Sequence, residues 1–425
     1  MKKVLIITYY WPPAGGSGVQ RWLKFVKYFR DFGIEPIVYT VEDPQYPIED
    51  LSLEKDIPEE IEIIKQPIWE PNKLFSLFGK KKTESGGFLN PNPSPFGRLL
   101  QFVRANYFIP DARKFWIKPS VKYLKKYLEE NKINLVITTG PPHSMHLIGL
   151  NLKQQLKIKW IADFRDPWTE IDYFHQLPLS KKAIEKHHHL EEEVLKKADA
   201  VLVVGDSMKK KYLKYNKNVI TVTNGFDEVE ESEVVELDSK FSLTHIGLMN
   251  ADRNPRMLWE VLAEIMNENL SFEADFELKL IGKLDPSILD DVASYQLSEK
   301  IQVIDYVSHN KVIQYQKKSQ VLLLIVNNVP SANQIITGKI FEYLMAKRPI
   351  LAIAPTTGDL SEIINKTNSG DVIDFNDAKK LKSTILEFYS KFKQGELTIE
   401  SKNIKQYHRR ELTKQVSEII EKITG

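Results

Sequence analysis

The sequence contains no cysteine, and this absence removes several classes of protein at once. Without a thiol the chain has no disulfide framework, no thiolate zinc ligand and no cysteine nucleophile. The net charge is also small, because 59 basic and 57 acidic residues leave a formal charge of +2. A charge of this size says little about binding partners. Long apolar runs are missing as well: no uninterrupted stretch approaches the roughly 20 residues that a membrane-spanning helix needs.

The chain opens on a short apolar run, VLIIT, at residues 4–8. Aromatic, proline and glycine residues follow it directly, so the run is too short for the hydrophobic region of a signal peptide. A buried first strand explains it better. We therefore expect a cytoplasmic protein whose contact with a membrane is at most peripheral.

The length of 425 residues favours two domains, and the 42% hydrophobic and 27% charged fractions are typical of globular proteins. Short apolar runs alternate with longer amphipathic segments, which predicts an α/β protein with parallel sheets covered by helices. The strands expected in a first series are residues 4–8, 36–40, 62–64, 135–139, 160–163, 200–204 and 219–222. Those of a second series are 241–246, 277–281, 301–304, 321–325, 350–353 and 371–373. The acidic stretch 227–238 separates the two series, so we predict two doubly wound, Rossmann-like domains.

Residues 71–119 interrupt this pattern, because they contain no long periodic element and mix basic with aromatic residues. A loop that packs its own aromatic side chains and leaves its lysines in water is one interpretation. The other is a surface that contacts an anionic membrane, because basic residues alternate with aromatic ones. The basic residues are Lys80, Lys81, Lys82, Arg98, Arg104, Arg113 and Lys114, and the aromatic ones are Phe96, Phe102, Tyr107, Phe108, Phe115 and Trp116.

Ligands of open parallel sheets bind beyond the carboxyl ends of the strands, so the residues after each strand matter most. After the first strand come Gly15, Gly16, Ser17, Gly18 and Arg21. The glycines allow a close approach of the backbone, and the helix that follows offers free N–H groups to a phosphate or a sugar hydroxyl. Their spacing does not match the dinucleotide fingerprint, so NAD binding is not indicated. A plain connecting turn is the alternative.

Two further loops are expected at the same edge of the sheet. One contains His143, which has a pKa suited to accepting or delivering a proton near neutral pH. The other contains Asp163, a candidate for orienting or deprotonating an acceptor hydroxyl, and Arg165, which suits an anionic acceptor. A buried loop histidine and an ion pair between Arg165 and Asp166 are the structural alternatives.

The most informative segment follows the strand expected at 321–325. Thr337, Gly338 and Lys339 begin an apolar helix, and backbone N–H groups beside a cation form a good diphosphate receptor. Glu342 lies one turn later, where a carboxylate can accept two hydrogen bonds from a ribose diol. Arg253 is a second candidate for neutralising a diphosphate, with surface ion pairing as its alternative.

Metal and nucleic-acid binding are not predicted. His187, His188 and His189 are consecutive in a charged helix, so their side chains point in different directions and cannot chelate one ion; we expect a solvated face there. We find no Asp-x-Asp motif in a convincing place after a strand. The lysine runs at 80–82 and 209–211 lack the organised basic face of a nucleic-acid binder.

Four stretches together resemble the retaining glycosyltransferases of family 4, which have the GT-B fold. They are VTNGFD at 222–227, GLMNADRNP at 247–255, KIFEYLMAKRPI at 339–350, and the loops 11–21, 140–144 and 163–168 taken together. The loops resemble those of bacterial members that build surface polysaccharides.

The resemblance implies two domains facing across a cleft: residues 1–226 for the acceptor and 227–403 for the donor, with a final helix at about 404–425 that packs back on the first domain. It implies that Glu342 binds ribose, that Lys339, Gly338 and Arg253 hold the diphosphate, and that amides around Val307 meet the base. The expected donor is a UDP- or GDP-linked sugar, the expected acceptor is a lipid-linked or oligosaccharide molecule, and neither a metal nor another cofactor is expected.

One residue departs from the family pattern. Gln334 stands where the family often has a glutamate that contacts the donor sugar, and an amide carries no charge. Its catalytic contribution and the choice of sugar therefore stay open, and Leu248 likewise replaces a common arginine. A sugar-nucleotide epimerase of the same fold and a non-catalytic nucleotide-sugar-binding protein are the alternative functions.

Overall fold

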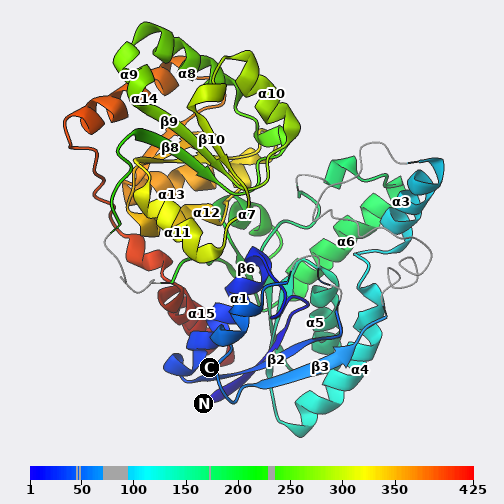
Figure 1. The fold of residues 1–425 in the computed structure, drawn as a ribbon. Helices are drawn as coiled ribbons and strands as arrows, with labels where there is room; N and C mark the ends of the chain where they lie inside the picture. The colour runs from blue at the N-terminus through cyan, green and yellow to red at the C-terminus, as the bar shows by residue number, and fades with distance from the viewer. Residues whose placement is uncertain (45, 47–48, 70–93, 172–173, 228–234) are drawn as a thin grey trace. The chain divides into compact units, whose positions relative to one another are not determined.

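The computed structural model describes residues 1–44, 46, 49–69, 94–171, 174–227 and 235–425. It divides into two compact units (Figure 1). Unit 1 consists of Met1–Asn224 and Arg409–Gly425, and unit 2 consists of Gly225–His408. Each unit is an α/β domain built around one parallel sheet.

Unit 1 contains a parallel sheet with the strand order β3-β2-β1-β4-β5-β6-β7. The strands are β1 (Lys2–Ile7), β2 (Ile34–Glu42), β3 (Glu62–Pro67), β4 (Leu135–Gly140), β5 (Lys159–Phe164), β6 (Ala200–Val203) and β7 (Val219–Thr221). The helices are α1 (Ser17–Phe29), α3 (Pro95–Tyr107), α4 (Lys114–Glu130), α5 (Ser144–Gln155), α6 (Lys181–Lys197), α7 (Asp206–Tyr212) and α15 (Arg409–Thr424). All of β4 and the last four residues of β1 are buried, as expected of central parallel strands.

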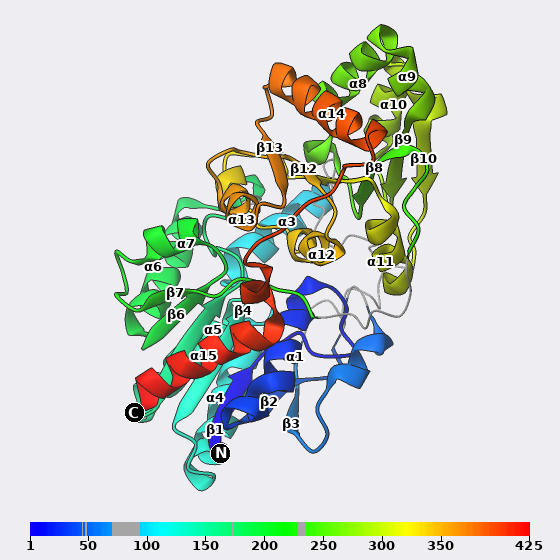
Figure 2. The same ribbon diagram turned by 90° about the vertical axis from the view of Figure 1, so that its left-hand side faces the viewer.

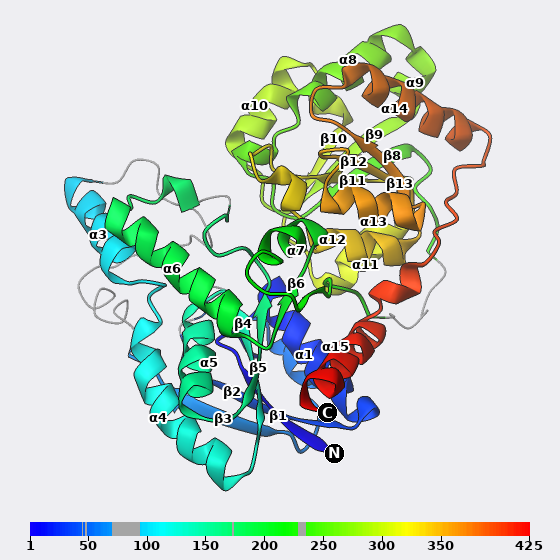
Figure 3. The ribbon, with the colours of Figure 1, turned by 180° about the vertical axis from the view of Figure 1, so that it is seen from behind.

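Two layers of helices cover this sheet (Figure 3). On one face α1 and α15 pack with Trp22 and Val416 in one apolar cluster. On the other face α4, α5 and α6 contribute Leu124, Ile148 and Val194 to a second cluster. The last helix of the chain thus completes the core of unit 1.

Unit 2 contains a parallel sheet with the order β10-β9-β8-β11-β12-β13 (Figure 2). The strands are β8 (Phe241–Ile246), β9 (Phe276–Ile281), β10 (Ile301–Ile304), β11 (Val321–Ile325), β12 (Ile350–Ile353) and β13 (Gly370–Ile373). The helices are α8 (Arg256–Glu268), α9 (Leu270–Asp275), α10 (Pro286–Ser294), α11 (His309–Lys318), α12 (Lys339–Ala346), α13 (Asp359–Thr367) and α14 (Ala378–Lys393). One apolar cluster joins the sheet to α8, α9, α10 and α14, and another joins it to α12 and α13.

The predicted fold class is confirmed, since both sheets are parallel and covered by helices. The prediction that residues 71–119 contain no long periodic element is wrong for the described part of that segment. The helix α3 and the first turns of α4 lie within it. Ser94 caps α3 by accepting a hydrogen bond from the Gly97 amide, and Pro95 occupies the first turn. Lys80, Lys81 and Lys82 lie outside the described residues.

The solvated face expected for the three histidines is also wrong at one position. His187 is buried, and its Nδ1 accepts a hydrogen bond of 3.0 Å from the Trp168 indole. Burial and the neighbouring His188 and Lys186 charges lower the pKa of His187 to about 4. It is therefore a neutral structural residue of unit 1.

Candidate functional site

In each sheet the strand order reverses at one place, and this place is where ligands of such folds bind. The reversal lies between β1 and β4 in unit 1 and between β8 and β11 in unit 2. The residues predicted for a donor gather beside the second of these points. Those predicted for an acceptor gather beside the first.

Unit 2 brings Lys339 against the loop that follows β8. Gly247 begins this loop with a φ of 117°, a conformation that favours glycine. A Cβ atom on Gly247 would also lie 2.6 Å from Cε and 2.7 Å from Nζ of Lys339. Glycine is thus required twice, once by the backbone and once by the lysine side chain that lies over it.

The amino group of Lys339 meets a histidine that the sequence analysis missed. Its Nζ lies 3.2 Å from Nε2 of His245, which is fully buried in β8. The Nδ1 of His245 lies 3.2 Å from the Leu323 carbonyl oxygen. A carbonyl oxygen only accepts, so Nδ1 carries the proton, and Nε2 is left to accept a hydrogen bond from Lys339.

Both groups have perturbed pKa values. Burial, together with the charges of Lys339 and Arg253, holds the pKa of His245 well below its usual value, so this imidazole is neutral. Burial and the Arg253 charge lower the pKa of Lys339 to about 7, although Glu342 opposes them. Lys339 therefore changes its charge near neutral pH in the ligand-free protein.

Arg253 supplies a second cation from the same loop. Its Nε donates to Oδ1 of Asn327 at 3.0 Å, and its Nη1 donates to the Leu248 carbonyl oxygen at 2.8 Å. These bonds connect the loop after β8 with the segment after β11, across the point where the strand order reverses. The guanidinium is thereby held in place before any ligand arrives.

Glu342 lies one turn after Lys339 on α12. Its Oε2 accepts a hydrogen bond of 2.9 Å from Nε2 of Gln316 on α11, and its side chain is half-buried. The next residue, Tyr343, is buried and anchors the helix to the sheet, because its hydroxyl accepts from the Ile246 amide at 3.3 Å. At the start of α12, Oγ1 of Thr337 accepts from the Lys339 amide, while Gly338 has open space around its Cα.

Three side-chain oxygens near this site are buried without a hydrogen-bond partner among the described residues. They are Oε1 of Gln334, Oδ1 of Asn250 and Oε1 of Gln316. A buried acceptor that lacks a donor costs free energy, so such atoms are common where a ligand or a water molecule completes the bonding. Gln334 belongs to a short 3₁₀ turn, Ala332–Gln334, ahead of α12.

Val307 lies after β10, beside a cavity that the sequence analysis did not foresee. The cavity has a volume of about 480 Å³, which is within the range of small-molecule sites. Its walls come from the loop after β9, from β10 with the loop that follows it, and from α10: Gly282, Lys283, Leu284, Leu289, Val303, Asp305 and Tyr306. Tyr306 is 89% exposed, so its ring is available to a planar ligand.

In unit 1 the three loops predicted from the sequence do come together. Nη1 of Arg165 donates to the Gly18 carbonyl oxygen at 2.5 Å, and Nη2 donates to the Pro141 carbonyl oxygen. A Cβ on Gly18 would lie 2.5 Å from Nη1 of Arg165, so glycine is needed there. Gly15 and Gly16 precede this position, and Ser17 is the first residue of α1. Arg165 thus clamps the glycine loop to the loop after β4.

Arg21 and Asp163 form an ion pair that is buried within unit 1. Nη2 of Arg21 donates to Oδ1 of Asp163 at 2.9 Å, and the Trp22 indole and the Thr139 hydroxyl donate to Oδ2 at 2.6 and 2.8 Å. Burial alone would raise the pKa of Asp163, but Arg21 and these hydrogen bonds outweigh it and lower the pKa. The carboxylate is fully buried, so its geometry supports a role in holding the loops.

His143 lies at the N-terminal end of α5. Its ring stacks on Trp168 at 4.6 Å between centroids, with an angle of 3° between the planes. Burial, with the charges of His146, Arg165 and His187, holds the pKa of His143 well below its usual value. Its Nδ1 has no hydrogen-bond partner among the described residues. A neutral imidazole of this kind accepts or donates a hydrogen bond, but it is not an acid at pH 7.

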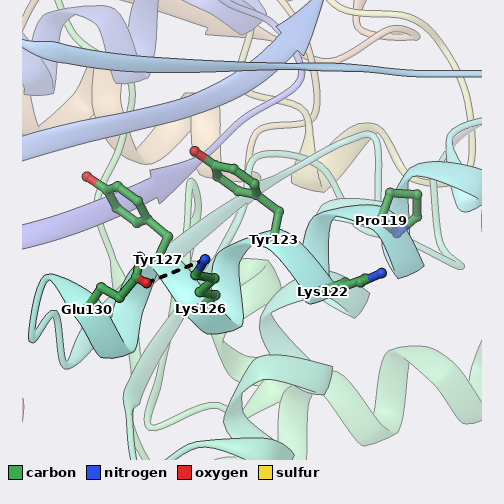
Figure 4. A pocket seen from close by; sticks show the side chains of 6 residues that line it. All are labelled: Pro119, Lys122, Tyr123, Lys126, Tyr127 and Glu130. Carbon is green, nitrogen blue, oxygen red and sulfur yellow. Dashed lines mark ion pairs between the residues drawn. The ribbon is translucent and has the colours of Figure 1, made fainter.

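A second cavity, of about 450 Å³, lies along one face of α4 (Figure 4). Its residues recur at helical spacing: Pro119, Lys122, Tyr123, Lys126, Tyr127 and Glu130. The two tyrosine rings are nearly parallel, and an exposed ion pair of 3.6 Å joins Lys126 to Glu130. None of the predicted site residues lines it.

The described residues contain no group of three or more histidine and acidic side chains placed to hold a metal ion. None of their helices combines the length and apolar character needed to cross a bilayer.

Part of the chain and its fold are similar to known proteins. Residues 240–391, from the start of β8 into α14, match the family described as Glycosyl transferases group 1. Sucrose-phosphate synthase from Thermosynechococcus elongatus has a TM-score of 0.63 at 15% identity, with 100% of this chain and 99% of that chain covered. HepE from Anabaena, solved with UDP and glucose, has a TM-score of 0.61 at 11% identity, with 99% of this chain and 100% of that chain covered.

An epimerase has a lower similarity. UDP-GlcNAc 2-epimerase from Methanocaldococcus jannaschii has a TM-score of 0.55 at 11% identity, with 99% of this chain and 100% of that chain covered. No curated protein matches the chain significantly. The fold is that of the GT-B glycosyltransferases, and the similarity to the group 1 family lies within unit 2.

Proposed function

We propose that this protein is a retaining glycosyltransferase of family 4 that moves a sugar from a UDP- or GDP-linked donor to a lipid-linked or oligosaccharide acceptor. The group 1 match covers the unit that holds the proposed donor site, and this match supports glycosyl transfer. The observation that carries the proposal is the cluster of Lys339, Arg253 and Glu342 beside the strand reversal of unit 2. Lys339 and Arg253 supply two cations for a diphosphate, and Glu342, one helical turn after Lys339, supplies a carboxylate for the ribose joined to it.

Each part of the donor has a proposed partner. Lys339, Arg253 and the amides after Gly338 bind the diphosphate, and Glu342 accepts hydrogen bonds from the ribose diol. The base lies at the amides around Val307, beside the cavity lined by Tyr306. Thr337 steadies the start of α12. Gln334 offers its unpartnered Oε1 to a hydroxyl of the sugar.

In the proposed reaction the bond between the anomeric carbon and the phosphate oxygen breaks, and the acceptor oxygen attaches to the same face. The acceptor proton passes to the leaving diphosphate, so no strong protein base is required. Lys339 and Arg253 stabilise the negative charge that develops on the phosphate. Because two side chains supply that positive charge, we propose a reaction without a metal cofactor.

The loops at the reversal of unit 1 form the proposed acceptor site. His143 is neutral and has a free ring nitrogen, so it suits an uncharged hydroxyl. Arg165 and the glycine loop 15–18 border the same edge. We place the reaction in the cytoplasm, in the synthesis of surface polysaccharide or a related glycoconjugate.

Two other functions have an observation in their favour. The similarity to UDP-GlcNAc 2-epimerase favours a sugar-nucleotide epimerase, which needs no acceptor. The amide at Gln334, in place of a carboxylate, favours a protein that binds a nucleotide sugar without transferring it.

One experiment separates these functions. The protein is incubated with a panel of nucleotide sugars, with and without an extract of lipid-linked and free saccharide acceptors. Release of nucleoside diphosphate that depends on the acceptor supports transfer. A change of the donor sugar without acceptor supports epimerisation, and binding without either reaction supports the third function.

A further inference from the structure

The helix α3 exposes an unusual amount of apolar surface. Phe96, Leu99, Phe102 and Tyr107 are 68%, 57%, 42% and 66% exposed, and α3 contains no buried residue. Most large apolar side chains of a folded domain are covered, so four exposed ones on a single helix call for an explanation.

These side chains are ordered around the helix axis. With roughly 100° per residue, the four exposed residues and the half-buried Leu100 and Val103 fall within one arc of about 160°, which also contains one polar residue, Asn106, in the last turn. Arg98 lies just beyond one edge of the arc and Arg104 just beyond the other. The helix carries no acidic residue, so its charge is uniformly positive.

The first turn of α4 continues this surface. Phe115 is 39% exposed and packs edge-to-face against Trp69, which is 54% exposed, with 4.7 Å between the ring centroids. The ammonium of Lys114 lies 5.2 Å from the Phe108 ring centroid and 5.0 Å from that of Phe115. Aromatic rings are thus again bordered by a cation.

The helix is held at one end. Nδ2 of Asn106 donates to the Pro178 carbonyl oxygen at 2.8 Å, and Oδ1 of Asn106 accepts from the Ser180 amide at 2.7 Å. These bonds attach the C-terminal turn of α3 to the loop ahead of α6, and the two helices lie side by side at the periphery of unit 1 (Figures 1 and 3). The apolar arc is therefore presented on a fixed support.

We propose that α3, with Lys114 and Phe115 of α4, binds the surface of an anionic lipid bilayer, with the apolar arc of α3 lying among the upper acyl chains. Cations on both sides of an apolar arc favour a bilayer over a protein partner. They extend their charged ends to phosphate headgroups while their stems stay apolar. The absence of acidic residues removes the repulsion that an anionic surface would otherwise exert. This binding does not depend on the proposed reaction.

The test is flotation of the full-length protein with vesicles of phosphatidylcholine, with or without phosphatidylglycerol. The wild type is expected to float with the anionic vesicles and to be released at high salt. The double variant Phe96→Ser/Phe102→Ser should lose binding by roughly tenfold or more. Arg98→Gln/Arg104→Gln should lose binding to the anionic vesicles.

The matched control is Leu51→Ser/Leu270→Ser, which removes from other surfaces two apolar side chains that are more exposed than Phe96 and Phe102. It should float like the wild type, and all variants should keep the wild-type melting temperature and nucleotide affinity. A wild type that stays at the bottom overturns the proposal, as does a Phe96→Ser/Phe102→Ser variant that floats normally. The oligomeric state is measured by light scattering. If Phe96→Ser/Phe102→Ser changes it, the arc binds a second copy of the chain, and the proposal is also overturned.

Discussion

The ammonium of Lys339 lies 3.2 Å from Nε2 of His245, a neutral imidazole that is buried beneath it in β8. This contact explains how a lysine persists beside Arg253 without a bound anion. His245 gives the amino group a hydrogen-bond acceptor but no negative charge, while burial and the Arg253 charge lower the pKa of Lys339 to about 7. The groups that face Lys339 are thus one neutral acceptor, one cation and, more weakly, Glu342.

The affinity for a nucleotide sugar is expected to fall as the pH rises above 7. The free protein loses the Lys339 proton near pH 7, and a bound diphosphate raises the pKa again, so binding above that pH must take up a proton. Isothermal titration at pH 8 in two buffers with different ionisation enthalpies measures this uptake. A nucleotide diphosphate sugar is the right ligand, because it lacks a terminal phosphate that titrates near pH 6.

Lys339→Arg is the control for this prediction. A guanidinium stays charged throughout the range, so the variant should bind with an affinity that no longer depends on pH. Equal heats in the two buffers for the wild type would contradict the assignment of the titration to Lys339.

The two glycines beside Lys339 should respond differently to alanine. Gly247→Ala places a methyl group within 2.7 Å of Nζ and forces a φ of 117° on alanine, so nucleotide affinity should fall by roughly tenfold and the protein should lose stability. Gly338→Ala meets open space at a helical φ of −58°, so the melting temperature should be unchanged or slightly higher.

The affinity of Gly338→Ala for a nucleotide tests whether Gly338 belongs to the diphosphate site. If the diphosphate approaches the backbone there, the stable variant should bind it less tightly. An affinity equal to that of the wild type would remove Gly338 from the proposed diphosphate site.

Glu342→Gln should weaken nucleotide binding without unfolding the helix. The amide keeps the size of the carboxylate but loses the charge-assisted hydrogen bonds to the ribose, which are worth about 1.5–3 kcal/mol. Kd for UDP or GDP should therefore rise by roughly 10- to 100-fold, as titration calorimetry would show. Glu362→Gln, on the exposed face of α13, is the control and should bind normally. A large fall in melting temperature would instead make Glu342 a structural partner of Gln316.

Asp163→Ala should destabilise unit 1, since it leaves the Arg21 guanidinium buried without its carboxylate. Breaking a buried ion pair costs about 3–5 kcal/mol, whereas the exposed pair of Arg410 and Asp31 should matter by at most about 1 kcal/mol. Urea denaturation followed by tryptophan fluorescence compares Asp163→Ala with Asp31→Ala. A stable Asp163→Ala protein that has lost transfer activity would restore the predicted catalytic role of Asp163.

Much of the fold follows from the periodicity of apolar residues. The strands β8, β11 and β12 have the bounds expected from the sequence, because buried parallel strands are short apolar runs with turn residues on both sides. The edge strand β10 also has the expected bounds, although none of its residues is buried. The helix α3 was not predicted from the sequence, because its apolar residues face solvent and Gly97 lies within it. Pro119 concealed α4, because it is the sixth residue of the helix and a proline inside a helix removes one backbone hydrogen bond.

The candidate site was only partly predictable. Lys339 and Glu342 share one helix, so their spacing places them together whatever the rest of the chain does. Arg21 and Asp163 are 142 positions apart, and only the parallel order of β1, β4 and β5 brings them into contact. His245 was missed because a histidine within an apolar strand resembles a core residue. A titratable group inside a buried run was the signal that could have revealed it.

The most direct test of glycosyl transfer is to count both products of one reaction. Mass spectrometry measures the mass gained by the acceptor, and chromatography measures the nucleoside diphosphate released. The account predicts that each nucleoside diphosphate appears with one added sugar residue, and that Glu342→Gln lowers both in equal proportion. Release of nucleotide without a gain in acceptor mass, or a gain that Glu342→Gln leaves unchanged, would contradict it.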